Sequence, residues 1–244
     1  MKKKILEIKE QVIRECEESN GGKTLCNKEF FTLVREGDKM VIKDCECRRK
    51  LDRRVKCFVA GIEKPFWDFE WNDIDGIDKK TLDEFDKFRN NVESCVDNKY
   101  RFFFTGKYGN GKTLVASLLL KDVLSKGYSG YILKASNLLK YIYSRDEDDE
   151  DMMDKIDSAD FLIVDEIDKL NGREKAINDA CDRIDTYMLN KCIILISNLN
   201  IKELSNNNYP QYFIDRLKNS KIITFKGNSY RDVVGNAYDN FEGE

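Results

Sequence analysis

Histidine is absent from the 244 residues of the chain, and proline occurs only twice. Without histidine, a metal site has to use cysteine or carboxylate ligands, and a catalytic base has to be an aspartate, a glutamate or a lysine. No apolar stretch approaches the ~18–20 residues that a membrane-spanning helix needs. The charged opening segment Met1–Ile8 lacks the apolar region of a secretion signal. These absences predict a soluble, cytoplasmic protein without a membrane partner.

Charge is distributed unevenly along the chain. The formal net charge is −3. Residues 1–60 hold 16 Lys or Arg against 11 Asp or Glu, a net of +5, so the remainder carries −8. A basic first segment on an acidic body favours an electrostatic role for that segment. An ordinary solvated surface is the alternative.

The first 62 residues predict a small module that is separate from the rest of the chain. Apolar residues recur at helical spacing over the opening ~17 residues, and Asn20-Gly21-Gly22 ends that helix. Two β-type runs, Phe30–Val34 and Met40–Lys43, follow as a predicted hairpin. A basic helix, Arg48–Val59, comes last in the module.

A second domain is expected over residues 79–244, after an aromatic-rich linker at 63–78. Its apolar strands alternate with helices, which is typical of an α/β protein whose parallel sheet is covered on both faces. The acidic run Asp146–Asp151 is expected to be a solvated loop. The predicted strands are 101–105, 130–134, 160–165, 192–197 and 221–225, and the predicted helices are 112–126, 136–144, 173–189 and 209–218.

A phosphate-binding pattern follows the first of these strands. Gly106-Lys107-Tyr108-Gly109-Asn110-Gly111-Lys112-Thr113 matches the P-loop pattern G-x-x-x-x-G-K-[ST] and opens an amphipathic helix. The glycines Gly106, Gly109 and Gly111, with Asn110 between them, allow backbone N–H groups to surround a phosphate at a helix N-terminus. Lys112 would reach the β- and γ-phosphates, and the Thr113 hydroxyl would bind Mg²⁺. The predicted cofactors are ATP and Mg²⁺.

Two further strands end in polar side chains that suit the same site. Phe161–Val164 is followed by Asp165 and Glu166. Asp165 could bind Mg²⁺ together with Thr113, and Glu166 could orient and deprotonate the attacking water. The strand 192–197 is followed by Asn198, whose amide would lie between the other two strand ends, near the γ-phosphate. A simple strand-ending turn at 198–200 is the alternative for Asn198.

With these three motifs the chain resembles the AAA+ ATPases, in which an asparagine at the position of Asn198 is called sensor 1. Over residues 40–235 it resembles the DnaC/DnaI-type helicase loaders of bacteria and phages, with the related IstB-type transposition ATPases next. The loader-like segments are Cys45-Glu46-Cys47 with the basic helix after it, Gly61-Ile62 with the aromatic connector, Ile196-Ser197-Asn198-Leu199, Ile214-Asp215-Arg216-Leu217 and Ser229-Tyr230-Arg231.

The resemblance implies roles for two arginines. Arg216 would be the arginine finger, presented to the γ-phosphate on a neighbouring subunit, and Arg231 would be the sensor-2 arginine. Both would supply fixed positive charge during phosphoryl transfer; a surface or ion-pair role is the alternative for each. The chain ends soon after Arg231, so a C-terminal helical lid is not expected. Many relatives have Asp-Asp where this chain has Asp165-Glu166, which weakens any finer placement.

The implied function is that of an ATP-dependent loader. It would bind a replicative helicase through its first 60 residues, self-associate through its ATPase domains and deliver the helicase onto single-stranded DNA, with ATP hydrolysis controlling release. Two alternatives stay open: a transposition ATPase that assembles on duplex DNA, and a nucleotide-gated adaptor with negligible hydrolysis.

The amino-terminal cysteines form a candidate zinc site, as the resemblance also implies. The hairpin would bring Cys26 close to Cys45 and Cys47, and Cys16 is available from the end of the preceding helix. Four thiolates suit tetrahedral zinc, although the spacing is poor and Cys57 is a substitute ligand. Unligated structural cysteines are the alternative.

A candidate contact for single-stranded DNA follows the second strand of the ATPase domain. Loaders often present a DNA-binding helix there, and Lys140 and Tyr141 offer a charge and a stacking face. A core-packing helix with exposed lysines is the alternative.

Overall fold

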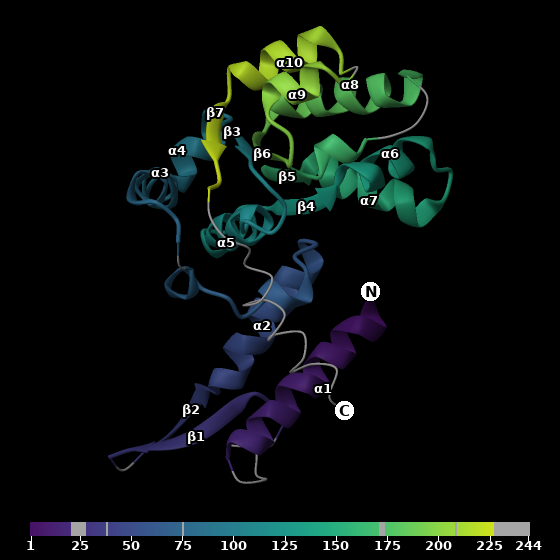
Figure 1. The fold of residues 1–244 in the computed structure, drawn as a ribbon. Coiled ribbons are helices and arrows are strands. Elements are labelled where there is room, and N and C mark those ends of the chain that lie inside the picture. The colour runs from purple at the N-terminus through teal and green to yellow at the C-terminus, as the bar shows by residue number, and fades with distance from the viewer. Residues whose placement is uncertain (21–27, 38, 75, 171–173, 208, 227–244) are drawn as a thin grey trace. The chain divides into compact units, whose positions relative to one another are not determined.

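The computed structural model describes residues 1–20, 28–37, 39–74, 76–170, 174–207 and 209–226. The chain divides into two compact units, Met1–Val59 and a larger one from Ala60 onward (Figure 1). Within the described ranges, no helix has both the length and the apolar character that crossing a membrane requires.

The first unit consists of two helices and a hairpin. Helix α1 (Lys2–Ser19) is followed by strands β1 (Phe31–Glu36) and β2 (Lys39–Asp44), which pair antiparallel, and by helix α2 (Glu46–Val59). A small core joins these elements, because Val12 of α1 packs against Phe30, Cys45 and Cys47. The predicted helix, hairpin and basic helix are therefore all present.

The second unit contains a parallel sheet of five strands in the order β4-β5-β6-β3-β7. The α/β class predicted from the alternation of strands and helices is confirmed. The strands are β3 (Arg101–Thr105), β4 (Gly130–Lys134), β5 (Phe161–Asp165), β6 (Cys192–Ser197) and β7 (Lys221–Thr224). The helices are α3 (Lys79–Asn90), α4 (Val92–Asp97), α5 (Lys112–Ser125), α6 (Ala135–Tyr143), α7 (Glu147–Ser158), α8 (Glu174–Asn190), α9 (Ile201–Ser205) and α10 (Gln211–Lys218).

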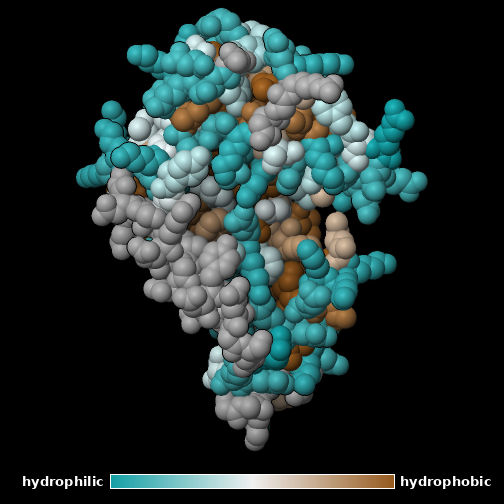
Figure 2. Space-filling view, turned by 45° about the vertical axis from the view of Figure 1, so that its right-hand side comes forward, coloured by the Kyte–Doolittle hydropathy of each residue, from teal (hydrophilic) through white to brown (hydrophobic). Residues whose placement is uncertain are grey.

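Helices cover both faces of this sheet (Figure 1). Successive side chains of a strand point to opposite faces, and β3 shows the result. Phe103 belongs to a cluster with buried side chains of α6 to α10, whereas Phe102 and Phe104 contact Phe85 of α3. Because both faces are buried, the strands can be apolar at every position. On the face drawn in Figure 2, hydrophilic side chains dominate the surface of this unit.

Residues 60–78, which include the segment expected as a linker, contact the body of the second unit. The Ala60 carbonyl accepts a hydrogen bond from the backbone N–H of Ile132 in β4 (2.9 Å). Lys121 of α5 donates to the carbonyls of Phe66, Trp67 and Phe69 at 2.5–2.9 Å. This segment is therefore held along β4 and α5.

The prediction of a solvated loop at Asp146–Asp151 is wrong, because these residues begin helix α7. The Asp146 side chain accepts from the backbone N–H of Asp148 at the helix start. Acidic side chains in a first helical turn are stabilised by the helix dipole and by the free N–H groups there. The run is therefore a helix-start signal.

Candidate nucleotide-binding site

The loop 106–111 joins the end of β3 to the start of α5, as its sequence predicts. Gly106 has φ +143°, and a Cβ atom there would lie 2.4 Å from the carbonyl oxygen of Phe225. Asn110 is buried and donates to that same carbonyl (3.1 Å). The loop is therefore fixed against the residue that follows β7, and only glycine fits its first position.

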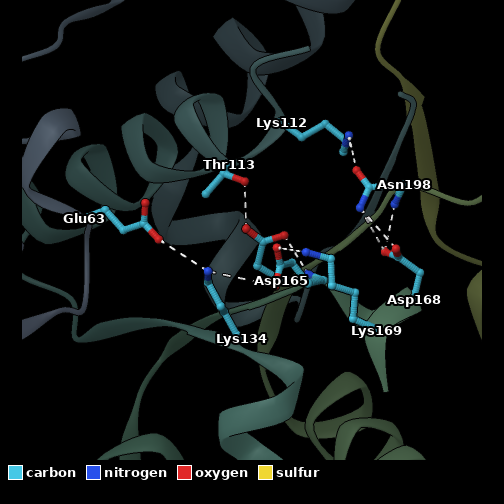
Figure 3. A network of polar contacts seen from close by, with 9 residues as sticks. Glu63, Lys112, Thr113, Lys134, Asp165, Asp168, Lys169 and Asn198 are labelled. Atoms are coloured by element: carbon cyan, nitrogen blue, oxygen red, sulfur yellow. Dashed lines mark hydrogen bonds and ion pairs between the residues drawn. The ribbon is translucent and has the colours of Figure 1, made fainter. Parts of the chain in front are cut away.

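Lys112 lies inside the loop. Its ammonium donates to the carbonyls of Gly106 (2.7 Å) and Lys107 (2.8 Å) and to Oδ1 of Asn198 (3.1 Å) (Figure 3). Burial lowers the pKa of Lys112, and the nearby carboxylates of Asp165 and Asp168 act in the opposite direction. The cation is thus held where the loop can present it to a phosphate.

Thr113 and Asp165 form a hydroxyl–carboxylate pair at the ends of α5 and β5. The Thr113 hydroxyl donates to Oδ2 of Asp165 (2.7 Å), and the backbone N–H of Glu166 donates to Oδ1 (2.6 Å). Burial raises the pKa of Asp165, although both hydrogen bonds oppose that rise. Hydroxyl and carboxylate oxygens are ligands that Mg²⁺ prefers, so these two residues could hold it.

Glu166 comes directly after β5 with φ 57° and ψ 39°, in the left-handed region. Its Oε1 pairs with the ammonium of Lys169 (2.5 Å), and its Oε2 lies 3.9 Å from that of Lys134. Lys134 also lies 3.8 Å from a carboxylate oxygen of Glu63 (Figure 3). The left-handed conformation costs about 1–3 kcal/mol and is typical of functional sites.

Asn198 follows β6, which pairs with β3 on one side and β5 on the other. Its position between the other two strand ends agrees with the sequence prediction. Its backbone N–H donates to Oδ1 of Asp168 (2.8 Å), and Nδ2 donates to Oδ2 of the same residue (3.1 Å). The amide therefore lies between Lys112 and Asp168.

Two other predicted residues, Arg216 and Lys140, make ion pairs outside this cluster. Arg216 lies on α10, and its guanidinium binds both carboxylate oxygens of Asp185 (2.7 and 3.2 Å). Arg231 lies outside the described residues. On α6, Lys140 pairs with Asp149 (2.9 Å) and lies over the ring of Tyr141 at 5.5 Å.

Three of the four predicted zinc ligands come together in the first unit. The sulfur atoms of Cys16, Cys45 and Cys47 all lie within 4.8 Å of one another. Cys26 lies outside the described residues. Cys57 is buried on α2 and does not belong to the cluster that the described cysteines form. Four sulfurs bound to a tetrahedral zinc ion at ~2.3 Å would be ~3.8 Å apart, so the spacing of the three suits zinc.

Three polar residues of the site were missed by sequence reasoning: Asp168, Lys134 and Lys169. Asp168 and Lys169 belong to a single 3-10 turn after β5, Ile167–Lys169, and no local motif predicts where its side chains point. Lys134 stands at the end of β4 next to Asp165 of β5 in the sheet register. The sequence offers one signal for Lys134: it is a polar residue at the end of a strand that precedes β5, the strand that ends in Asp165.

Comparison with known proteins agrees with this geometry. The replicative helicase loader DnaC of Escherichia coli (strain K12) is 25% identical over 167 residues, which are 64% of this chain and 67% of DnaC. The crystal structure of the DnaC helicase loader superposes with a TM-score of 0.57 at 18% identity, covering 67% of this chain and all of that one. Replication initiator DnaA, bound to AMPPCP and single-stranded DNA, superposes with a TM-score of 0.51 at 17% identity and covers 70% of this chain.

This chain spans about half of that DnaA chain (54%). Both structural likenesses show the AAA+ fold. A family model, "IstB-like ATP binding protein", matches residues 11–234. With a P-loop, an acidic strand end and an asparagine strand end on adjacent strands, the chain belongs to the family of IstB-like ATP binding proteins.

Proposed function

We propose that this protein is an ATP-dependent loader that binds a replicative DNA helicase and delivers it onto single-stranded DNA. One observation carries the ATPase part: two hydrogen-bonded pairs, Lys112 with Asn198 and Thr113 with Asp165, lie at the carboxyl ends of adjacent parallel strands. The backbone N–H of Glu166 also donates to Asp165. The similarity to the replicative helicase loader DnaC supports the loader part.

In the proposed reaction, the loop amides and Lys112 bind the β- and γ-phosphates, and Thr113 and Asp165 hold Mg²⁺. Bound Mg²⁺ supplies neutralisation of charge on the phosphate oxygens. Glu166 takes the proton of the attacking water, because its carboxylate lies beside the acidic strand end. Its ion pairs with Lys169 and Lys134 hold that carboxylate in place.

Arg216 would complete the site of a neighbouring subunit, so hydrolysis would depend on self-association through the ATPase domains. The bidentate pair with Asp185 holds the guanidinium half-exposed on α10. A partner site would have to compete with Asp185 for this cation. Arg231 is proposed as the sensor-2 arginine.

The first unit is proposed as the helicase-binding part. Its hairpin exposes Met40 and Ile42 (61% and 66%), which lie on the same side of β2. Exposed large apolar side chains on a two-stranded hairpin suit a protein interface. Zinc held by Cys16, Cys45, Cys47 and Cys26 would brace the hairpin against the helices.

Single-stranded DNA is proposed to contact Lys140 and Tyr141 on α6. The structure places Lys140 largely exposed but paired with Asp149 of the acidic helix α7. A phosphate would have to displace that carboxylate, so this contact would be weak at physiological salt. In a binding titration, Lys140→Ala should reduce the slope of log K against log salt by about 1.

The loader function is tested by mixing the full chain with its replicative helicase, with and without ATP, and measuring the mass of complexes by light scattering after size exclusion. We expect a complex that is lost when Met40 and Ile42 are both changed to serine. The control changes two exposed apolar side chains of the second unit, Leu189 and Ile222, to serine. If the chain forms no complex in either nucleotide condition, it is not a loader.

The family match also supports a second candidate, a transposition ATPase that assembles on duplex DNA. Filaments on duplex DNA with ATP, together with no helicase complex, would favour that candidate.

A further inference from the structure

The short turn after β5 carries a side chain that contacts Asn198 at the end of β6. The 3-10 turn Ile167–Lys169 is anchored from below, because Ile167 is fully buried and its carbonyl accepts a hydrogen bond from the hydroxyl of Tyr209. Asp168 and Lys169 therefore project from a fixed backbone. Lys169 pairs with Glu166, while Asp168 faces Asn198 (Figure 3).

Asp168 holds Asn198 by both its main chain and its side chain. Oδ1 of Asp168 accepts from the backbone N–H of Asn198 at 2.8 Å. Oδ2 and Oδ1 lie 3.1 and 3.4 Å from the Nδ2 atom of Asn198. Hydrogen bonds to an ionised acceptor are about twice as strong as neutral ones. The strand end is thus tied to one carboxylate at two points.

The opposite end of the Asn198 amide faces a cation. Oδ1 of Asn198 accepts from the Lys112 ammonium at 3.1 Å. The two ends of an asparagine amide have the same shape but opposite hydrogen-bonding character. A half-turn of the amide would place its oxygen against the Asp168 carboxylate and its NH₂ against the ammonium. Only one orientation satisfies both neighbours.

We propose that Asp168 is a positioning residue for ATP hydrolysis, which fixes the Asn198 amide so that its NH₂ group donates and its oxygen stays with Lys112. This inference rests on the proposed ATPase function. The carboxylate of Asp168 occupies one N–H of the amide, and the other N–H is left to donate to a phosphate oxygen. Without Asp168 the amide can turn over, and it then presents an oxygen that repels phosphate.

The test compares steady-state ATP hydrolysis by Asp168→Ala, Asp168→Asn, Asn198→Ala and the double variant D168A/N198A. Loss of one positioned donor typically lowers kcat about 100-fold or more, which we expect for N198A. We expect D168A to lower kcat about 10-fold, because the Asn198 amide would be turned over in about half of the molecules and the end of β6 would be held less firmly. KM should change less than about 2-fold. The D168N variant keeps an acceptor oxygen and should lie between wild type and D168A.

The double variant distinguishes positioning from a general structural effect. If Asp168 acts through Asn198, D168A/N198A is no slower than N198A alone. Asp151→Ala on the exposed side of α7 is the matched control and should keep wild-type kcat. A kcat for D168A equal to that of wild type, or a full further loss in the N198A background, overturns the proposal.

A second readout does not depend on turnover. The side-chain NH₂ signals of Asn198, identified in ¹⁵N-labelled protein by their loss in N198A, should move toward free-amide positions in D168A. If the Asn198 side-chain signals are the same in D168A as in wild type, the positioning role is overturned, whatever the effect of D168A on hydrolysis. Wild-type protein that binds ATP but never hydrolyses it would instead defeat the proposed function, while the NMR shift would still report whether Asp168 sets the amide.

Discussion

Glu166 combines a strained backbone with an unusually crowded carboxylate. It adopts the left-handed region without being glycine, and lysines approach both of its carboxylate oxygens. The hydrogen bond that Lys169 donates to Glu166 raises the pKa of Lys169, so the lysine stays charged at neutral pH. The same ion pairs that hold the carboxylate in place must loosen when it accepts a proton from water.

Replacing Glu166 by Gln separates ATP binding from ATP hydrolysis. The change keeps the shape of the side chain but removes the base, so we expect kcat to fall at least about 100-fold. The affinity for a fluorescent ATP analogue should stay within about 2-fold, because the phosphate-binding groups are untouched. Glu150→Gln on α7 is the control. Wild-type protein that is already as slow as E166Q would favour the adaptor alternative.

Gly106 and Gly127 provide a matched pair for the phosphate-binding loop. Both have φ in the range that side chains rarely adopt (+143° and +90°), so alanine is strained at both positions. Only at Gly106 does the new Cβ meet a backbone oxygen, that of Phe225 at 2.4 Å, whereas nothing lies within 4 Å at Gly127. We expect G106A to lose nucleotide binding in an equilibrium titration and G127A to keep it. Equal binding by the two variants would contradict this account of the loop.

Sequence predicted the residues of the nucleotide site that belong to contiguous motifs. Lys112, Thr113 and Asp165 are fixed by the strands and the helix beside them, so their meeting follows from the parallel sheet. Asp168 and Lys134 could not be found in this way. Their roles depend on how a short turn and a neighbouring strand end pack, and those contacts have no local signature.

Among the helices, α7 shows how one signal was misinterpreted. Charge runs are usual in loops, but here the acids occupy the first turn and Asp146 caps it. The apolar positions that hold α7 to the core, such as Ile156 and Met153, come after the run. Strands and long helices were predicted almost to the residue, because their apolar periodicity extends over their whole length.

Helices α1 and α2 are joined by an ion pair that makes the stability of the first unit depend on pH. Arg54 is almost fully buried and donates to Glu15 (2.8 Å), and Lys50 lies 2.5 Å from the other oxygen. Burial by itself would raise the pKa of Glu15, but the two cations outweigh it and hold this pKa below that of a free glutamate. The pair therefore stabilises the fold above the unfolded pKa of ~4.3 and is lost as pH falls through the lower folded pKa.

We expect Arg54→Met to destabilise α1 by about 1–3 kcal/mol at pH 7, because it removes the buried partner of a partly buried carboxylate and leaves Lys50 on its other oxygen. The difference from wild type should shrink once Glu15 is protonated in both. Hydrogen–deuterium exchange of α1 peptides at pH 7 and at about pH 3 measures this, with Arg49→Met on the exposed side of α2 as control. A deficit of R54M that is the same at both pH values would show that packing, not charge, is what Arg54 contributes.

At the level of the complete chain, the two units have separate cores and different chemistry. All tyrosines and both tryptophans lie beyond residue 59, so intrinsic tryptophan and tyrosine fluorescence reports on the second unit alone. The cysteine cluster belongs to the first unit and the nucleotide site to the second. Their responses to perturbation should be separable.

Zinc removal is the perturbation that tests this separation. We expect the purified chain to contain one zinc per molecule by elemental analysis. Structural zinc contributes directly to folding, so chelation should increase hydrogen exchange in α1 and the hairpin. ATP-analogue binding by the second unit should not change. The double change of Cys45 and Cys47 to serine should remove the metal and Cys95→Ser should not. Metal-free wild-type protein, or zinc retained by the double variant, would leave the cysteines as core residues only.

The order of the strands has a consequence for how the protein is made. Strand β3, which leads into the phosphate-binding loop, pairs only with β6 and β7, about 90 and 120 positions further along the chain. During synthesis the loop therefore leaves the ribosome long before either neighbouring strand of β3 has been made. Until then, the three phenylalanines of β3, at 102–104, have no strand to pair with. ATP cannot help a chain that lacks β7 to form this loop, because the loop is held by the carbonyl of Phe225, which comes 115 positions after Asn110. The ability to bind nucleotide is thus acquired only after β7 and Phe225 have been made.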